Sequence, residues 1–244
     1  MNKIKLSITL CVTTLLLTGC NSESATFINQ SPVEDVQPVL YNLGGAQLPD
    51  DVEFNQYSLD VASGKTVAVF IFGQPLPAHP GEPVRINPNI EFGGLKEPIE
   101  LISAIDGVVG FIQEQPDSND YEVFLMTQEN SQWVIGYDHV TDLQVVQGQA
   151  VSVGDVLGKA ALENNGYYRY ELQINHEEGD DTTMYCPTDL LDASVQTDIQ
   201  ASLDTFVGDW NESYRAVFGT DAYPTQTGGC IQPLVTNAES QGNL

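Results

Sequence analysis

The sequence predicts a mainly β protein with an antiparallel architecture and one amphipathic helix near its C-terminus. Short runs rich in β-branched and aromatic residues recur from residue 99 to residue 174, and turn signals separate them. No helical periodicity interrupts these runs, which favours antiparallel strands over alternating strands and helices. The period of the apolar residues changes to that of a helix only after residue 193.

The first nineteen residues have the pattern of a bacterial secretion signal. Lys3 and Lys5 precede an apolar run over Leu6–Leu17, and that run is too short to span a membrane as a helix. We therefore expect residues 1–19 to be removed. The ending Leu-Thr-Gly-Cys resembles the lipobox of bacterial lipoproteins, which implies lipid attachment at Cys20. An ordinary signal followed by a chance cysteine is the alternative.

Residues 20–50 are polar, with scattered Pro and Gly, and predict a flexible tether between the lipid and a folded domain. The β domain is expected to cover residues 51–186, beginning near Val52. Its strands are predicted from alternating or β-branched runs bounded by turn signals: Tyr57–Val61, Thr66–Phe72, Glu122–Met126, Gln132–Tyr137 and Tyr168–Ile174.

The segment between Ala193 and Phe218 predicts an amphipathic helix packed on the sheet. A helix on a membrane surface is the alternative, but the polar face has acidic residues and almost no Lys or Arg. The apolar residues that fall on one helical face are Ile199, Leu203, Phe206, Val207, Trp210, Tyr214, Val217 and Phe218.

Four cysteines indicate one disulfide. Cys11 lies in the signal and Cys20 is the expected lipid site, which leaves Cys186 and Cys230 in an oxidising compartment. A bridge between them would tie residues 187–244, the expected helix and tail, to the β domain.

The chain is strongly acidic, with 34 Asp and Glu against 8 Lys and Arg and a net charge of −26. Such a field opposes binding to nucleic acid or other polyanions. A solvated acidic surface explains the charge, while a cationic partner or calcium is the alternative. The candidate calcium clusters are Asp117, Asp120 and Glu122, and Glu177, Glu178, Asp180 and Asp181.

Four motifs in order resemble the lysostaphin-type (LytM-like) peptidoglycan endopeptidases over residues 86–172. They are Asp106-Gly107, Tyr137-Asp138-His139, the glycine-spaced segment Val145–Gly158, and the aromatic-Glu-Leu strand at Tyr170-Glu171-Leu172. The resemblance implies a duplicated-hybrid-motif fold, a β sandwich or barrel-sandwich hybrid. Biotinyl and lipoyl carriers share the glycine-spaced segment, but a carrier needs a lysine on an exposed hairpin, and none lies between Lys96 and Lys159.

In that family a zinc ion is held by His-x-x-x-Asp and by the second His of His-x-His. The first motif falls on Asn87 and Glu91, and the second falls on Tyr167 and Arg169, while His139 matches the histidine of Tyr-x-His. Arginine has no acceptor atom and a permanent charge, so Arg169 cannot bind a metal. Tyrosine, with a pKa near about 10, is a poor base at neutral pH.

These replacements predict a degenerate site without metal or cofactor. We expect an ion pair between Arg169 and Glu91 in place of the metal, and a structural role for His139. A metal site rebuilt with His79 or His176 is the alternative. Tyr167, Tyr168, Tyr170 and Trp133 are candidates to line a groove, although aromatic residues on strands usually belong to the core.

The predicted function is that of a non-catalytic, LytM-like envelope lipoprotein that binds peptidoglycan or regulates a cell-wall hydrolase. It would be anchored through Cys20 and face the periplasm, and Asn21 after the cysteine favours the outer membrane in the resemblance. The alternative is an active zinc metalloendopeptidase that cleaves peptidoglycan cross-links with an atypical ligand set.

Overall fold

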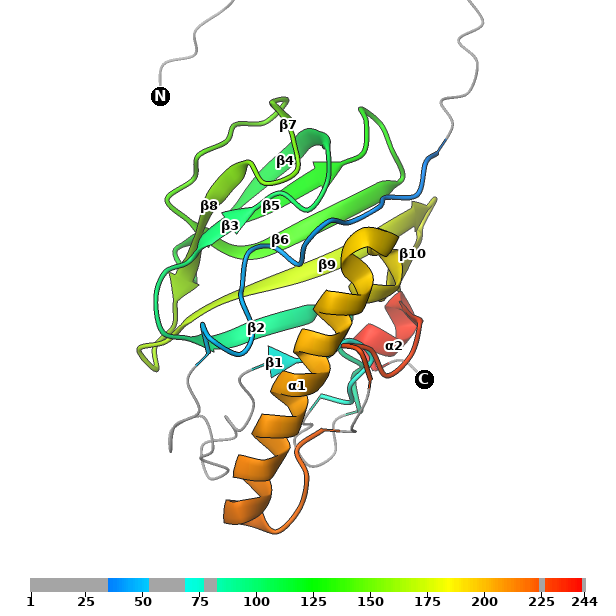
Figure 1. Cartoon of the computed structure of the whole chain (residues 1–244). Helices are drawn as coiled ribbons and strands as arrows, with labels where there is room; N and C mark the ends of the chain where they lie inside the picture. The colour runs from blue at the N-terminus through cyan, green and yellow to red at the C-terminus, as the bar shows by residue number, and fades with distance from the viewer. Residues whose placement is uncertain (1–34, 53–68, 77–82, 224–226, 243–244) are drawn as a thin grey trace, which may run out of the picture. The chain divides into compact units, whose positions relative to one another are not determined.

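The computed structural model describes residues 35–52, 69–76, 83–223 and 227–242 (Figure 1). The secretion signal, Cys20, the expected strand Tyr57–Val61 and His79 lie outside these residues. The elements in chain order are β1 (Val69–Phe70), β2 (Ile90–Leu95), β3 (Glu100–Ile102), β4 (Gly107–Gln115), β5 (Asp120–Met126), β6 (Trp133–Thr141), β7 (Ala150–Val151), β8 (Val156–Leu162), β9 (Tyr168–Glu178), β10 (Asp181–Tyr185), the 3₁₀ turn η2 (Pro187–Leu190), α1 (Ala193–Phe218), β11 (Leu234–Thr236) and α2 (Asn237–Gln241).

The described strands join in one open antiparallel sheet, which confirms the predicted mainly β architecture. Its main order is β1-β2-β9-β8-β6-β5-β4-β7, and β9 also pairs with β6 along most of its length. Off this order, β3 pairs with β8, β10 pairs with β9, and β11 pairs with β10. The expected strand Thr66–Phe72 is reduced to Val69–Phe70 within the described residues.

One face of the sheet forms the hydrophobic core because apolar residues alternate along the central strands. Val123 and Leu125 on β5, Tyr137 on β6 and Leu172 on β9 are completely buried. Their neighbours in sequence, such as Glu122, Asp138 and Glu171, are only half-buried. Strand alternation therefore gives the sheet a core face and a polar face.

Helix α1 has the bounds that the apolar periodicity predicts. The Asp192 side chain caps its first turn by accepting a hydrogen bond from the Ser194 backbone N, and Gly219 ends it in the left-handed conformation with a φ of 75°. Leu203, Phe206, Val207 and Trp210 are buried, as expected. The prediction for Val217 is wrong, because its side chain is 60% exposed. Helical spacing shows which residues share a face but not how far along the helix the core extends.

The C-terminal segment belongs to the same compact unit as the sheet, which runs from Glu34 to Leu244. The predicted disulfide between Cys186 and Cys230 is present, with the two Cα atoms 6.1 Å apart. A Cβ atom on Gly229 would lie 2.8 Å from Leu203 Cδ1 and 3.6 Å from Ile90 Cδ1, so the C-terminal loop packs between α1 and β2.

The folded domain begins earlier than residue 51, so the expected boundary of the tether is wrong. Leu40 is completely buried, its backbone N donates to Leu190 O, and its O accepts from Asp192 N, both over 2.8 Å. Asp35 accepts hydrogen bonds from Ser131 and Gln132 and contacts His176. The polar composition of the segment did not indicate that it is folded, because a few buried apolar side chains such as Leu40 are enough to order a segment that packs against the sheet.

Candidate functional site

A row of carboxylates crosses the polar face of the sheet. In the strand register Glu91 of β2 lies opposite Glu171 of β9, and Asp138 of β6 lies on the other side of Glu171. Like charges opposite one another are unfavourable unless something compensates them. The two groups that do so in this structure are Arg169 and His139.

A β-bulge puts two consecutive residues of β6 into this row. Tyr121 pairs with Val140 and Val123 pairs with Tyr137, so Glu122 alone lies opposite both Asp138 and His139. His139 has a φ of 60°, a left-handed conformation that is uncommon outside glycine. The backbone N of His139 donates to Oδ1 of Asp138 over 2.7 Å. The bulge lets adjacent side chains contribute to one cluster, where a regular strand would place them on opposite faces.

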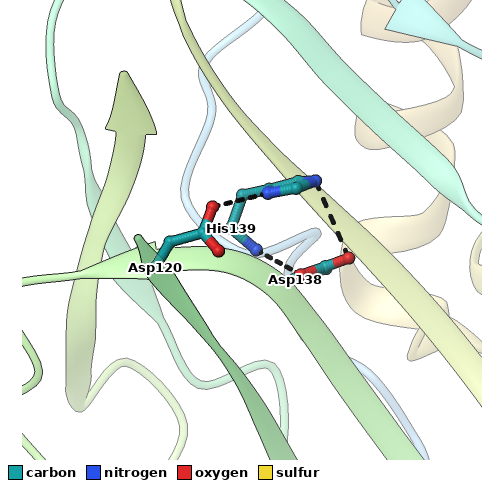
Figure 2. A group of neighbouring side chains, drawn as sticks. All are labelled: Asp120, Asp138 and His139. Carbon is teal, nitrogen blue, oxygen red and sulfur yellow. Dashed lines mark hydrogen bonds and ion pairs between the residues drawn. The ribbon is translucent and has the colours of Figure 1, made fainter. Parts of the chain in front are cut away.

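Asp120, at the start of β5, holds the His139 ring from the other side. Oδ2 of Asp120 lies 2.7 Å from Nδ1 of His139, and the Asp120 side chain is 3% exposed. The second ring nitrogen, Nε2, lies 3.7 Å from Oδ2 of Asp138 and 3.5 Å from Oε1 of Glu171. Figure 2 shows the ring between Asp120 and Asp138.

The surrounding carboxylates keep His139 protonated. Burial lowers the pKa of the imidazole, but its hydrogen bonds with Glu171 and Asp120 outweigh burial and raise the pKa to about 9. Asp120, Asp138 and Glu171 contact the His139 ring, while the structural role expected for His139 stays a prediction.

The predicted ion pair between Arg169 and Glu91 is present. Nη1 of Arg169 lies 3.1 Å from Oε1 of Glu91, Nε lies 3.2 Å from Oε1 of Glu163, and Nη1 lies 4.0 Å from Oε1 of Glu171. The Arg169 side chain is 28% exposed, so these contacts are partly screened from water.

Two carboxyl groups near the row hold protons more tightly than usual. Burial, followed by the negative charge of Glu171, raises the pKa of Glu91 to about 7 despite Arg169. Burial, followed by the charges of Asp138 and Glu171, raises the pKa of Glu122 to about 7. Burial is the larger cause in both carboxyl groups, and the neighbouring carboxylates add to it.

The residues that the resemblance aligns with zinc ligands have other partners in the structure. The Asn87 side chain is engaged elsewhere, since its Nδ2 donates to the backbone oxygens of Ile71 and Asn89. Tyr167 lies in the turn before β9, where its backbone N donates to Asn165 Oδ1. Arg169 places a permanent positive charge beside Glu91. In the structure Arg169 contacts Glu91, and Glu171 contacts both Arg169 and His139. The Asn87 amide bonds to backbone oxygens instead.

Two of the four candidate groove aromatics belong to the core. Tyr170 is completely buried, donates its hydroxyl to Leu43 O over 2.6 Å, and stacks on Phe92. Trp133 is 6% exposed and packs against His176 and Tyr185. Tyr167 and Tyr168 are half-buried.

Neither candidate calcium cluster gathers around one point in the described part of the chain. There, the acidic and histidine side chains whose potential ligand atoms lie within 4.8 Å of one another are Asp120, Asp138 and His139. His176, considered for a rebuilt metal site, bonds instead to Asp35, with Nε2 2.7 Å from Oδ2.

Sequence reasoning missed Asp138, Glu163, Glu171 and Asn89 as members of the cluster. The sequence did indicate that Glu171 lies near Arg169, because the two residues are two positions apart and their side chains therefore point to the same face of β9. Asp120 was considered only for calcium, and regular strand alternation would place Asp138 and His139 on opposite faces. A cavity of about 170 Å³ opens beside the cluster, lined in part by Asp117, Asp120, His139, Glu163 and Arg169.

No protein-family model matches this sequence, and no curated protein matches it. Solved structures with a similar fold exist. The solution structure of lysostaphin is 14% identical over 45% of this chain and 44% of that chain, with a TM-score of 0.37. The structure of LytU is 16% identical over 46% of this chain and 74% of that chain, with a TM-score of 0.37.

A zinc-containing peptidase from Vibrio cholerae is also similar, with 21% identity over 43% of this chain and 32% of that chain and a TM-score of 0.35. The chain thus spans less than half the length of the lysostaphin structure. Each likeness covers less than half of this chain and concerns the fold alone.

Proposed function

We propose that this protein is a non-catalytic, LytM-like envelope lipoprotein that binds peptidoglycan or regulates a cell-wall hydrolase. The observation that supports this most is the contact of 3.1 Å between Arg169 Nη1 and Glu91 Oε1. By the resemblance, both residues stand at positions of zinc ligands. A guanidinium cation bonded to the remaining carboxylate opposes a zinc ion at that place.

The pair can keep the polar face of the sheet in shape without the reactivity of a metal. Arg169 links β9 to β2 and to Glu163 at the end of β8, so three consecutive strands of the sheet share its charge. The cavity beside His139 and Arg169 is lined by several carboxylates and one guanidinium group, which are available to form hydrogen bonds with a ligand.

The proposal includes a lipid anchor at Cys20 and an envelope location facing the periplasm, at the outer membrane. Its support is the lipobox-like ending of the N-terminal segment and the position of Asn21. Among the described residues, no helix has the length and apolar character needed to cross a membrane. Labelling of cells with a radioactive fatty acid should mark the wild-type protein and not the Cys20→Ser variant. Equal labelling of both would refute the anchor.

Peptidoglycan binding and hydrolysis are tested together on the purified protein. It should sediment with insoluble peptidoglycan, while the same protein unfolded by heat should not. It should release no soluble fragments, with or without added zinc. Failure to sediment, together with failure to alter the rate of a cell-wall amidase, would contradict the proposal.

The second candidate is an active metallopeptidase with an atypical ligand set. The observation in its favour is the meeting of Asp120, Asp138 and His139, whose potential ligand atoms lie within 4.8 Å of one another. Zinc-dependent cleavage of peptidoglycan that stops on addition of a chelator would favour this candidate over the first.

A further inference from the structure

Strand β4 leaves part of one long edge of the sheet open. It pairs with β5 over residues 108–115, but with β7 only over residues 107–108. The loop before β7 forms two more backbone hydrogen bonds with Val109. From residue 110 to residue 115, β4 has no backbone partner other than β5 in the part of the chain that the structure describes. This edge lies on the side of the sheet away from α1 (Figure 1).

The backbone groups that point outward from this edge belong to Ile112 and Glu114. In the hairpin turn after β4, Asn119 N donates to Gln115 O over 2.8 Å, so the C=O of Gln115 points toward β5. Bonding groups alternate in direction along an antiparallel strand, and the register from Phe111 to Gln115 is regular. The N–H and C=O of Ile112 and of Glu114 therefore point away from β5, which leaves four backbone groups for a neighbouring strand.

The open residues carry none of the usual protection of a strand edge. Proteins keep such edges from pairing with other chains by means of lysine, proline or a bulge. The bulge of β4 lies before Phe111, and Pro116 follows the strand. No Lys or Arg occurs between Lys96 and Lys159, a segment that includes β3 to β7 entirely. The charge on the open edge is that of Glu114, which is exposed.

An aromatic pair stands beside the open edge. Phe111 of β4 lies opposite Phe124 of β5, the two rings stack with their centroids 3.9 Å apart, and the Phe111 side chain is 41% exposed. On the other side of Phe124 the residue in register is Gly136, which adds no side chain over the ring. Side chains alternate between the faces of a strand, so Phe111 and Glu114 point to opposite faces.

We propose that residues 111–115 of β4 are a docking edge for an extended, basic segment of another protein, which adds to the sheet as an antiparallel strand. A Lys or Arg of the segment faces Glu114 and exchanges two backbone hydrogen bonds with it, while an apolar residue three positions further on contacts Phe111. Opposite charges that face each other across two strands stabilise the pairing. The proposal goes beyond the proposed function, because strand addition at this edge neither requires nor excludes peptidoglycan binding.

The charge of the protein favours a basic partner over a second copy of this chain. The net charge of the full chain is −26, so two copies repel each other. Pairing of two β4 edges would also bring two Glu114 side chains close together, with no Lys or Arg on β4 or β5 to compensate them. The same charges attract a basic segment.

The test uses the purified protein and synthetic peptides of about eight residues that alternate Lys and Val, the pattern that the register requires. The unmodified peptide should bind, and a peptide that alternates Glu and Val should not. N-methylation of the Lys amides removes the donors that face β4 and should weaken binding by at least about tenfold. N-methylation of the Val amides, which face away, should change binding by less than about twofold. Both methylated peptides carry the same charge, so the comparison separates strand addition from adsorption to an acidic surface.

Variants of the edge test the same contacts from the side of the protein. Glu114→Gln removes the facing charge and should weaken binding about two- to fivefold. Glu114→Pro also removes an outward N–H and should weaken binding by at least about tenfold. Proline is tolerated on an edge strand where its nitrogen faces solvent, so the unfolding midpoint of this variant should stay close to that of the wild type. The matched control is Glu212→Gln, at an exposed position of α1, which should bind the peptide as the wild type does.

Amide hydrogen exchange locates the bound peptide. Binding should slow exchange at Ile112 and Glu114, whose N–H groups point outward, and have little effect at Phe111 and Gln113, which already bond to β5. Equal binding of the two methylated peptides, or protection away from this edge, would overturn the proposal. So would a dimer in sedimentation that Glu114→Pro dissociates, since the occupant would then be a second copy. Failure of peptidoglycan sedimentation, measured separately, would bear on the proposed function and leave this result unchanged.

Discussion

Arg169 and Glu91 form a diagonal ion pair across strands β9 and β2, with Nη1 3.1 Å from Oε1. Glu91 lies directly opposite Glu171 in the register, and Arg169 lies two residues before Glu171 on the same face. The guanidinium of Arg169 therefore reaches the carboxylate of Glu91, which would otherwise face only the negative charge of Glu171. Charge-assisted hydrogen bonds of this kind are stronger than neutral ones, and here they join neighbouring strands.

Removal of this guanidinium should destabilise the protein. In Arg169→Met, Glu91, Glu163 and Glu171 lose their shared cation, and we expect the free energy of unfolding to fall by about 1–3 kcal/mol, since the pair is partly buried. Urea unfolding at neutral pH measures the change. The control is Lys159→Met, which removes an exposed ion pair with Asp142 and should cost at most about 1 kcal/mol. Equal effects of the two substitutions would show that the Arg169 cluster contributes no more than a surface pair.

The segment before residue 51 should be part of the cooperative fold. Leu40→Ala removes a completely buried side chain and should cost about 2–5 kcal/mol. Val39→Ala changes the neighbouring side chain, which is 48% exposed, and should alter stability by at most about 0.5 kcal/mol. Thermal and urea unfolding of both variants provide the comparison. If Leu40→Ala were as stable as the wild type, the segment would not contribute to the core.

Helix α1 should contribute to stability through its central turns, where its buried side chains lie between Leu203 and Asn211, more than through its last turn. Trp210→Ala removes one of the largest completely buried side chains and should cost about 3–5 kcal/mol. Val217→Ala, at an apolar position that is 60% exposed, should have an effect within about 0.5 kcal/mol. Calorimetric melting of the two variants tests this difference, and a comparable loss from both would place Val217 in a packed interface.

The stability of the metal-free protein should depend on pH through Glu122. Burial and the charges of Asp138 and Glu171 raise its pKa in the folded state to about 7, from an ordinary value of 4.5. The folded state therefore binds this proton more tightly than the unfolded state, so the contribution is fully present below pH 4.5 and is lost as the pH rises to about 7. Glu122→Gln cannot lose a proton there.

The measurement is the free energy of unfolding of the wild type and of Glu122→Gln, in chelator, at several values between pH 4.5 and pH 8. The wild type should become progressively less stable relative to the variant up to about pH 7, and the difference should then level off. A difference that stays constant over this range would contradict the assignment.

Local sequence patterns predicted the helix and the strands whose positions depend on local interactions or on the burial of one apolar face. The bounds of α1 followed from apolar spacing, and the central strands β5, β6 and β9 followed from β-branched and aromatic runs. The start of the domain was misplaced because the segment around Leu40 has little periodicity of its own and is ordered by contacts with Leu190 and Asp192. Its order depends on residues 150 positions away in the chain, which composition does not reveal.

The sequence by itself determined which faces of the strands and of the helix are apolar, which cysteines were left to pair, and that a cation stands at Arg169 where a zinc ligand would be expected. Only the tertiary structure decided that Asp138 and His139 lie on the same face, because the bulge that rotates His139 arises from pairing with β5 rather than from the sequence of β6 alone. It also decided that Asp120 and Glu171 meet His139. Strand register sets such meetings, and register depends on the packing of the whole sheet.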